Sequence, residues 1–547
     1  MSKILLLTKR LSRLDNMSKK ESIKNIGSIT VEYDSKKGLK IIEDSNFDLV
    51  VSDEEIDGIL SGIQILEHIR ENSKKNPLFI IGTKVSKAST SLAAIEFDAD
   101  DIITDKIDIN DFVVRVKKTL ELQYIKNEVR MAIKDGNINQ AEKICIDQIK
   151  NRSKSYGWCL KKRIEILSMK KEFRALEQIT KKILTKKNIE FVRVGLIEAL
   201  YGQQFFQDAR SYAEETTKHF PFSVKSYILM GDCYISINDV KKAMKCYEKA
   251  IVISPLSVKA KHKLANTSEL NGDPYKMAKS YGILAESTIN TFHQSEQDLI
   301  NLSSGIVISG TNQKNFNGDI QKTYKLINSA SKKNPFNKKI KVHALITDAN
   351  ISIAKGNAQD GLQKLGLVIK EYEKEISGDS FAMMAISSTY QRLKIENKAD
   401  YFQRIAEKLS SKKIKISKTE VAYMGHIKEQ RKIKEAATLN SVGIDCYKCK
   451  DYHGAVESIL DALSIRPNQI TYCFNLLKVI LKAIEIGSHD EKMINVFEEK
   501  LNFIEQIKDH NKFNETYCQI ENRWKELMPQ NNRMLDLSNL SGSSSLN

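Results

Sequence analysis

A pair of short helical patterns recurs along this 547-residue chain and constrains its fold more than any other feature. The clearest copy covers residues 227–255, where an apolar face is interrupted at Asn238 and resumes until Pro255. Small residues stand where two helices must approach closely, and large aromatic residues surround them. These positions are Tyr227, Gly231, Tyr234, Ala243 and Tyr247. The segment therefore predicts two amphipathic helices joined by a tight turn.

The same pattern returns at intervals of about 34 residues. The small residue that opens the second helix is an alanine at four successive intervals: Ala141, Ala175, Ala209 and Ala243. Residues 439–467 repeat the pattern far downstream. One such hairpin cannot bury its apolar face alone, so neighbouring copies must stack. The sequence predicts an all-α superhelical solenoid with a concave surface.

The repeated unit resembles the tetratricopeptide repeat (TPR), because every signature position of residues 227–255 holds an allowed residue type. The resemblance implies that the first helices of the repeats line a groove that holds a protein or peptide. We expect TPR repeats over residues 123–302 and TPR-like repeats with capping helices over 320–530. The intervening residues 303–319 are rich in Gly, Asn and Ser and predict a long loop. The Ser-rich residues 531–547 predict a disordered tail.

Residues 1–122 follow a different pattern, in which strands alternate with helices. Apolar or β-branched runs occur at residues 4–7, 28–33, 47–52, 78–81 and 101–104, with helical patterns between them. This alternation predicts an α/β doubly wound parallel sheet, whose chemistry lies at the carboxyl ends of the strands. No Gly- or Pro-rich linker follows, so we expect a rigid connection to the solenoid.

This first segment resembles the response-regulator receiver domain. The residues that carry the resemblance are FDLVVSD at 47–53, GIQILEHIR at 62–70 and FDADDIIT at 97–104. In that family the aspartate at the end of the third strand accepts a phosphoryl group, and Asp53 occupies that place. The resemblance implies two-component signalling, with a histidine kinase or another two-component protein as a partner.

Several positions around Asp53 depart from the family pattern. The family holds Mg²⁺ with an acidic pair after the first strand, where this chain has Thr8 and Lys9. The hydroxyl residue of the fourth strand, Thr83, comes one position late. The family's lysine after the fifth strand matches Lys106, behind Asp105, only with a slip of one residue. We expect an impaired site in which Lys9 pairs with Asp53, and a role for Mg²⁺ only if Asp53 is phosphorylated.

The chain contains no sequence motif of the common enzyme classes that we searched for, among them nucleotide-binding loops, zinc-protease motifs and the nucleophile elbow. The eight cysteines show no disulfide framework. Cys446 and Cys449 form a C-x-x-C near His453, and the repeat pattern favours free, packed cysteines over a metal site. We therefore expect a protein that binds and does not catalyse, and no resident metal or cofactor.

Basic residues outnumber acidic ones by 86 to 69, which gives a formal charge of +17. Many of them crowd residues 150–187, which would suit nucleic acid, anionic lipid or an acidic partner. The aromatic residues Tyr156, Trp158 and Phe173 are not interleaved with these lysines in the manner of a nucleic-acid platform, so a solvated outer face is the preferred interpretation. No run of about 20 apolar residues predicts a membrane span. The apolar start is too short for a signal peptide, and we expect a cytoplasmic protein.

The sequence thus predicts a non-enzymatic bacterial signalling adaptor, in which a receiver-like domain is coupled to a protein-binding TPR solenoid. Two alternatives stay open. One is a genuine phospho-accepting response regulator that uses Asp53 in a phosphorelay, and the other is a nucleic-acid-associated protein that uses the basic face. The sequence also leaves open the identity of the partner, a homodimer, and the number of repeats in the second half.

Overall fold

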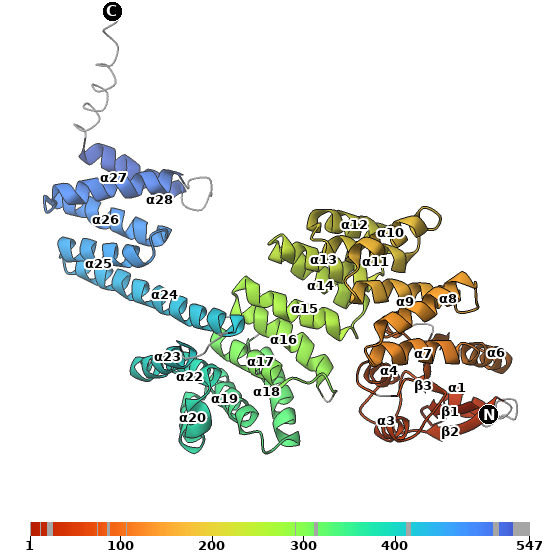
Figure 1. Ribbon diagram of the computed structural model, residues 1–547. Helices are drawn as coiled ribbons and strands as arrows, with labels where there is room; N and C mark the ends of the chain where they lie inside the picture. Colours follow the sequence, from red (N-terminus) through yellow and green to blue (C-terminus); the bar gives the residue numbers. More distant parts are fainter. Residues whose placement is uncertain are drawn as a thin grey trace, which may run out of the picture. The chain divides into compact units, whose positions relative to one another are not determined.

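The computed structural model describes residues 2–10, 12–18, 26–73, 75–84, 88–104, 107–289, 291–310, 316–411, 417–506 and 514–528 (Figure 1). Two compact units divide the chain, Met1–Tyr423 and Met424–Asn547. The first unit contains a β-sheet and a long run of helices, and the second is helical. Among the described residues, no helix is both long and apolar enough to span a lipid bilayer.

Five parallel strands form the sheet at the start of the first unit, in the order β2-β1-β3-β4-β5. The strands are β1 (Ser2–Leu7), β2 (Gly27–Glu32), β3 (Leu49–Asp53), β4 (Leu78–Thr83) and β5 (Asp101–Thr104). The central strands are continuous apolar runs because helices cover both faces of the sheet. This arrangement confirms the predicted doubly wound α/β fold.

Two apolar layers hold the helices against the sheet. On one face, Leu14 of α1 (Arg13–Ser18) and Phe112 of α6 (Ile109–Leu120) pack on the strands. On the other face lie α3 (Ser35–Asp44), α4 (Gly62–Glu71) and α5 (Ala88–Glu96), with Ile42, Leu66 and Ala93 fully or almost fully buried.

Antiparallel helix pairs follow without a break after α6 (Figure 1). They are α7 (Gln123–Lys134), α8 (Ile138–Lys150), α9 (Tyr156–Met169), α10 (Phe173–Leu184), α11 (Glu190–Gly202), α12 (Phe206–His219), α13 (Val224–Ser236), α14 (Val240–Ile253), α15 (Val258–Ser268) and α16 (Pro274–Thr288). The first unit continues through α17 (Glu296–Ser309), α18 (Phe316–Lys333), α19 (Lys338–Ala354), α20 (Ala358–Glu371), α21 (Glu373–Ser377), α22 (Ser380–Arg392) and α23 (Glu396–Ser411).

The turns between paired helices repeat one backbone feature. A residue with left-handed backbone stands in each of the first four turns: Gly136, Lys171, Gln204 and Asn238, with φ between 57° and 78°. These positions recur at the interval of about 34 residues predicted from the sequence. Only the first is a glycine, so the repeat geometry imposes this conformation on residues that seldom adopt it.

Small residues do lie where the helices of a pair meet. Ala141, Ala209 and Ala243 are fully buried. A Cβ atom on Gly231 would lie 2.5 Å from the ring of Tyr247, which crosses from α14 to α13. The hydroxyl of Tyr247 donates to Asp232 at 2.6 Å, so the ring is fixed in place.

The predicted long loop at residues 303–319 is wrong. Residues 303–309 are the buried last turns of α17, and α18 begins at Phe316. Gly305 leaves room for Tyr423, whose hydroxyl donates to the carbonyl of Asn301 at 2.6 Å. Serine and glycine therefore stand here because a neighbouring side chain approaches the helix closely. Residues 311–315 lie outside the described residues.

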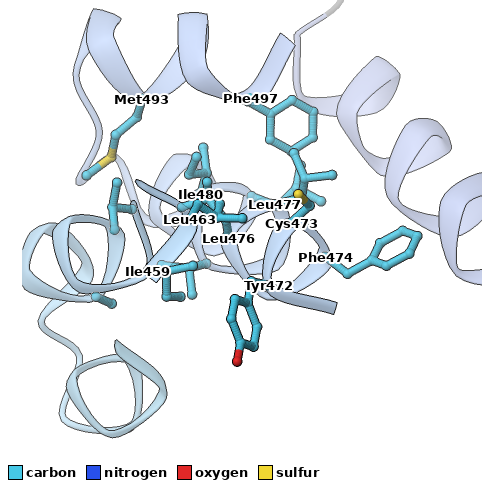
Figure 2. Packing of buried hydrophobic residues seen from close by; sticks show 14 of the residues in the cluster. Ile459, Leu463, Tyr472, Cys473, Phe474, Leu476, Leu477, Ile480, Met493 and Phe497 are labelled. Carbon is cyan, nitrogen blue, oxygen red and sulfur yellow. The ribbon is translucent and has the colours of Figure 1, made fainter. Parts of the chain in front are cut away.

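The second unit is built from the rest of α24 (Lys418–Lys448), which crosses the division between the units, and from α25 (Tyr452–Ile465), α26 (Ile470–Ile486), α27 (Glu491–Gln506) and α28 (Asn514–Leu527). Figure 2 shows side chains of α26, among them Leu477 and Cys473, between Ile459 of α25 and Phe497 of α27. Trp524 of α28 stacks on Phe497 with ring centroids 4.2 Å apart, as expected for a capping helix. The predicted tail at 531–547 lies outside the described residues.

Candidate functional site

Asp53 ends β3 and lies beside Gly82 of β4, its register partner. A Cβ atom on Gly82 would lie 3.2 Å from Asp53 Oδ1. The glycine therefore keeps this side of the carboxylate open at the carboxyl end of the sheet. This edge is where ligands bind in open α/β sheets.

Thr8, which follows β1, is the direct partner of Asp53. Its Oγ1 donates to Asp53 Oδ2 at 2.5 Å and lies 2.5 Å from Ser12 Oγ. The expected ion pair between Lys9 and Asp53 is wrong, since the described residues show Thr8 in that contact and no such pair. Lys9 is exposed and lines the pocket beside the carboxylate.

A pocket of about 330 Å³ lies over Asp53. Its lining includes the cationic side chains of Lys9 and Lys84, the acidic Glu54 and Glu55, and the apolar Ile103 and Ile107. Residues of both signs of charge thus line the pocket beside the carboxylate, together with apolar residues.

A second acidic residue near Asp53 was missed by the sequence analysis. Asp15 of α1 is 2% exposed and accepts a hydrogen bond from the Tyr33 hydroxyl at 2.9 Å. Burial raises the pKa of Asp53, hydrogen bonds from Thr8 and Ser12 oppose that rise, and the charge of Asp15 adds to it. No motif marked Asp15, because only the fold brings α1 over the end of β3.

Three further residues were predicted to lie beside Asp53, namely Thr83, Asp105 and Lys106. Thr83 lines the pocket, but its hydroxyl lies 3.2 Å from Glu54 Oε2, and Thr90 donates to Glu54 Oε1 at 2.7 Å. Thr83 is therefore held toward Glu54. Asp105 and Lys106 lie outside the described residues.

The described residues do not fit the Mg²⁺ site that the receiver family implies. Mg²⁺ requires a near-octahedral set of oxygen ligands. Asp53 offers one carboxylate, and one of its oxygens is taken by Thr8. Asp15 accepts a hydrogen bond from Tyr33, and the basic residue Lys9 lines the pocket.

A buried charge cluster joins the sheet domain to the first helices of the solenoid. Asp100, just before β5, is fully buried, and its carboxylate lies 2.9 Å from Arg70, 2.8 Å from Lys126 and 3.0 Å from Arg130. Burial alone would raise the pKa of Asp100, but the charges of Arg130, Arg70 and Lys126 lower it to about 2. The two α7 residues, Lys126 and Arg130, thereby tie the helix to the sheet domain.

Part of the basic segment at 150–187 faces this cluster. Lys162 of α9 lies 3.1 Å and Lys161 3.7 Å from Asp98. The ring of Trp158 makes cation–π contacts with Lys126, Arg130 and Lys162, whose charged groups lie 5.5 to 5.7 Å from its centroid. Other lysines of the segment pair with glutamates, as Lys170 does with Glu142 at 2.9 Å. Sequence analysis assigned these charges to a solvated face and missed their internal partners.

Comparison with known proteins agrees with this division of the chain. Residues 12–117 match the family model "Response regulator receiver domain", and residues 224–255 match "Tetratricopeptide repeat". Response regulator ArlR of Staphylococcus saprophyticus is 32% identical over 99 residues, which are 18% of this chain and 44% of that protein. Its counterpart in Staphylococcus haemolyticus is 27% identical over 96 residues, 18% of this chain and 42% of that protein. The match thus spans less than half the length of these relatives.

Among solved structures, a chain of the APC/C hetero-tetramer Cut9–Hcn1 is 12% identical, with a TM-score of 0.27 over 76% of this chain and 96% of that chain. The chain carries a response regulator receiver domain at its start, followed by a helical solenoid that contains a tetratricopeptide repeat.

Proposed function

We propose that this protein is a non-enzymatic signalling adaptor, whose receiver domain has an impaired phosphorylation site and serves as a docking module. The TPR solenoid binds a protein or peptide partner, as TPR repeats in general do, in a groove lined by the first helix of each repeat. The partner would be a component of a two-component signalling system, met in the cytoplasm.

The hydrogen bond between Thr8 and Asp53 is the observation that carries this proposal. A hydroxyl stands where a metal-binding carboxylate is required, and it satisfies an oxygen of the residue that would accept the phosphoryl group. Without the metal, the charge that develops on the transferred group loses its main electrostatic stabilisation. The receiver domain would then act by binding a partner.

The buried charge cluster supports a rigid coupling between docking module and solenoid. Arg130 and Lys126 belong to the first solenoid helix and contact Asp100 of the receiver domain. A partner that displaces Asp100 would therefore disturb α7 directly, which makes the receiver domain a site for control of the groove.

The proposal is tested by intact-mass spectrometry of the full chain after incubation with Mg²⁺ and acetyl phosphate or phosphoramidate. We expect no phosphoryl adduct on the unaltered protein, and the Asp53→Ala variant should likewise show a single peak at its own mass. A phosphoryl adduct that disappears in Asp53→Ala would refute the impaired site.

One observation favours a second candidate, a genuine phospho-accepting response regulator. The pocket over Asp53 is open, and the side chains of Lys9 and Lys84 border it. Two cations beside a carboxylate could neutralise an incoming phosphoryl group in place of a metal ion. In that case the adduct should form without Mg²⁺ and should weaken in Lys9→Ala and Lys84→Ala.

A further inference from the structure

Glu67 and Glu71 of α4 converge on His293, which lies between α16 and α17. Glu67 Oε1 is 2.9 Å and Glu71 Oε2 is 3.9 Å from His293 Nε2. The two glutamates are four residues apart and so share one face of their helix. One ligand atom from each residue falls in a group less than 4.8 Å across.

Among the described residues, the Nε2 atom of His293 is a buried polar atom without a hydrogen-bond partner. The Glu67 side chain is only 5% exposed. His293 Nε2 is buried and makes no hydrogen bond, so its short contact with Glu67 lacks the geometry of one. Buried polar groups almost always have a partner, and a buried carboxylate without one is costly. His293 Nε2 therefore lacks the partner that a bound cation would supply.

A negative charge on Glu67 is also unfavourable at this position. Burial, and then the charges of Glu71 and Glu96, raise the pKa of Glu67 to about 8, while Lys261 opposes that rise. Burial lowers the pKa of His293, so its imidazole is neutral near pH 7 and free to act as a ligand. A cation at this position would stabilise the charged form of both glutamates.

We propose that Glu67, Glu71 and His293 bind one divalent first-row transition-metal ion. One imidazole nitrogen and two carboxylate oxygens suit Zn²⁺, Mn²⁺, Fe²⁺ or Co²⁺, whereas Mg²⁺ and Ca²⁺ take oxygen ligands. Zinc holds such ligands at about 2.0–2.2 Å, so ligand atoms on one ion lie roughly 3–3.5 Å apart. The two observed separations bracket that range. Binding displaces the proton that Glu67 otherwise retains, and that proton passes to solvent.

The segment that carries His293 is held in place. The Thr291 hydroxyl donates to the carbonyl of Thr288 at 2.7 Å and accepts from the His293 backbone N–H at 3.2 Å. Phe292 contacts the ring of His68 edge-on, with centroids 5.1 Å apart. A metal ion here would therefore link receiver helix α4 to the solenoid through a preorganised ligand, at a site separate from the Asp53 pocket.

Cobalt titration of the full chain tests the proposal, because Co²⁺ bound to protein nitrogen and oxygen has visible absorption bands. The exposed thiols Cys449 and Cys518 are replaced by serine beforehand, since they could bind the same ions. We expect one equivalent of Co²⁺ to bind and zinc to displace it. His293→Ala should lose that equivalent.

Two further variants make the result specific. Glu71→Gln alters a half-exposed side chain, so the protein should fold and still lose the cobalt bands. His219→Ala is the matched control, because His219 and Glu215 form an exposed pair 3.6 Å apart on one helix, and it should bind as the unaltered protein does. Absence of a tight equivalent in the unaltered chain, or equal cobalt spectra in the unaltered chain and His293→Ala, would overturn the site.

Discussion

Arg130 of α7 lies 3.0 Å from the carboxylate of Asp100, and both side chains are buried. The same guanidinium lies 2.9 Å from Asp98. One arginine of the solenoid thus contacts two carboxylates of the receiver domain, which Arg70, Lys126 and Lys162 also contact. Because a buried charge without its partner is very costly, this contact should decide the stability of the junction.

Replacement of Arg130 by methionine should destabilise this junction. The change keeps much of the side-chain volume and removes one charge that contacts both Asp98 and Asp100. Because Arg70, Lys126 and Lys162 remain, the cost should lie below the about 3–5 kcal/mol of a buried charge left without a partner. Trp158 stacks beside Arg130, so its fluorescence reports the junction once the other tryptophan is removed by Trp524→Phe. We expect Arg130→Met to lower the urea midpoint of that signal.

The matched control is Arg210→Met in the same background. Arg210 pairs with Glu214 at 2.7 Å on a partly exposed helix face, and such pairs contribute about 0–1 kcal/mol. Its urea midpoint should stay close to that of the unaltered protein. Equal losses in the two variants would show that the buried cluster has no special role.

The same junction should be sensitive to acid. The folded-state pKa of Asp100 is about 2, below its ordinary value of 3.8, so its stabilising contribution is complete above about pH 4 and is lost as pH falls toward 2. We expect Trp158 fluorescence to report local opening over this range. In Asp100→Asn the acid dependence should shrink, because no proton binds at that position; an unchanged profile would contradict the assignment.

Much of the fold could be predicted because its rules are local. Alanines at a constant spacing along the sequence predicted the helix pairs, and Ala209 and Ala243 are buried as that spacing requires. The prediction of a loop at residues 303–319 was wrong because the contact that decides this segment is between residues far apart in the sequence. Gly305 and its neighbouring serines are small because Tyr423, far along the chain, packs against them. Composition alone cannot distinguish a loop from a helix that a distant side chain approaches closely.

The candidate site was harder to predict than the fold. The position of Asp53 followed from the strand pattern, and its openness follows from Gly82 in the neighbouring strand. The roles of Thr8 and Asp15 depend on which side-chain atoms meet across separate elements. Sequence reasoning chose Lys9 for its charge, whereas the shorter Thr8 makes the contact with Asp53.

Restoring the family's acidic pair should create a response to Mg²⁺. In the double variant Thr8→Asp and Lys9→Asp, new carboxylates crowd Asp53, and like charges at short range lower stability. Binding of Mg²⁺ relieves that repulsion and returns about 2.7 kcal/mol when its concentration is a hundred times the dissociation constant. Thermal denaturation of the full chain should show a midpoint that rises with Mg²⁺.

Thr8→Val controls for loss of the hydroxyl alone. It removes the hydrogen bond to Asp53, which costs about 1.5–3 kcal/mol for a charged acceptor, but it supplies no metal ligand. Its midpoint should fall and stay independent of Mg²⁺. If Mg²⁺ stabilises the unaltered protein as strongly as the double variant, the site is competent as it stands.

The close approach of α13 and α14 can be tested at Gly231. In Gly231→Ala the new methyl group meets the ring of Tyr247, which is 1% exposed and hydrogen-bonded to Asp232, so the ring has no room to move. Overpacking of this kind costs about 1–3 kcal/mol. Gly366→Ala is the opposite case, because nothing lies within 4 Å of the new atom and alanine favours an exposed helix by about 1 kcal/mol. Circular dichroism melts should therefore move in opposite directions for the two variants, and a stabilised Gly231→Ala would refute the close approach of α13 and α14.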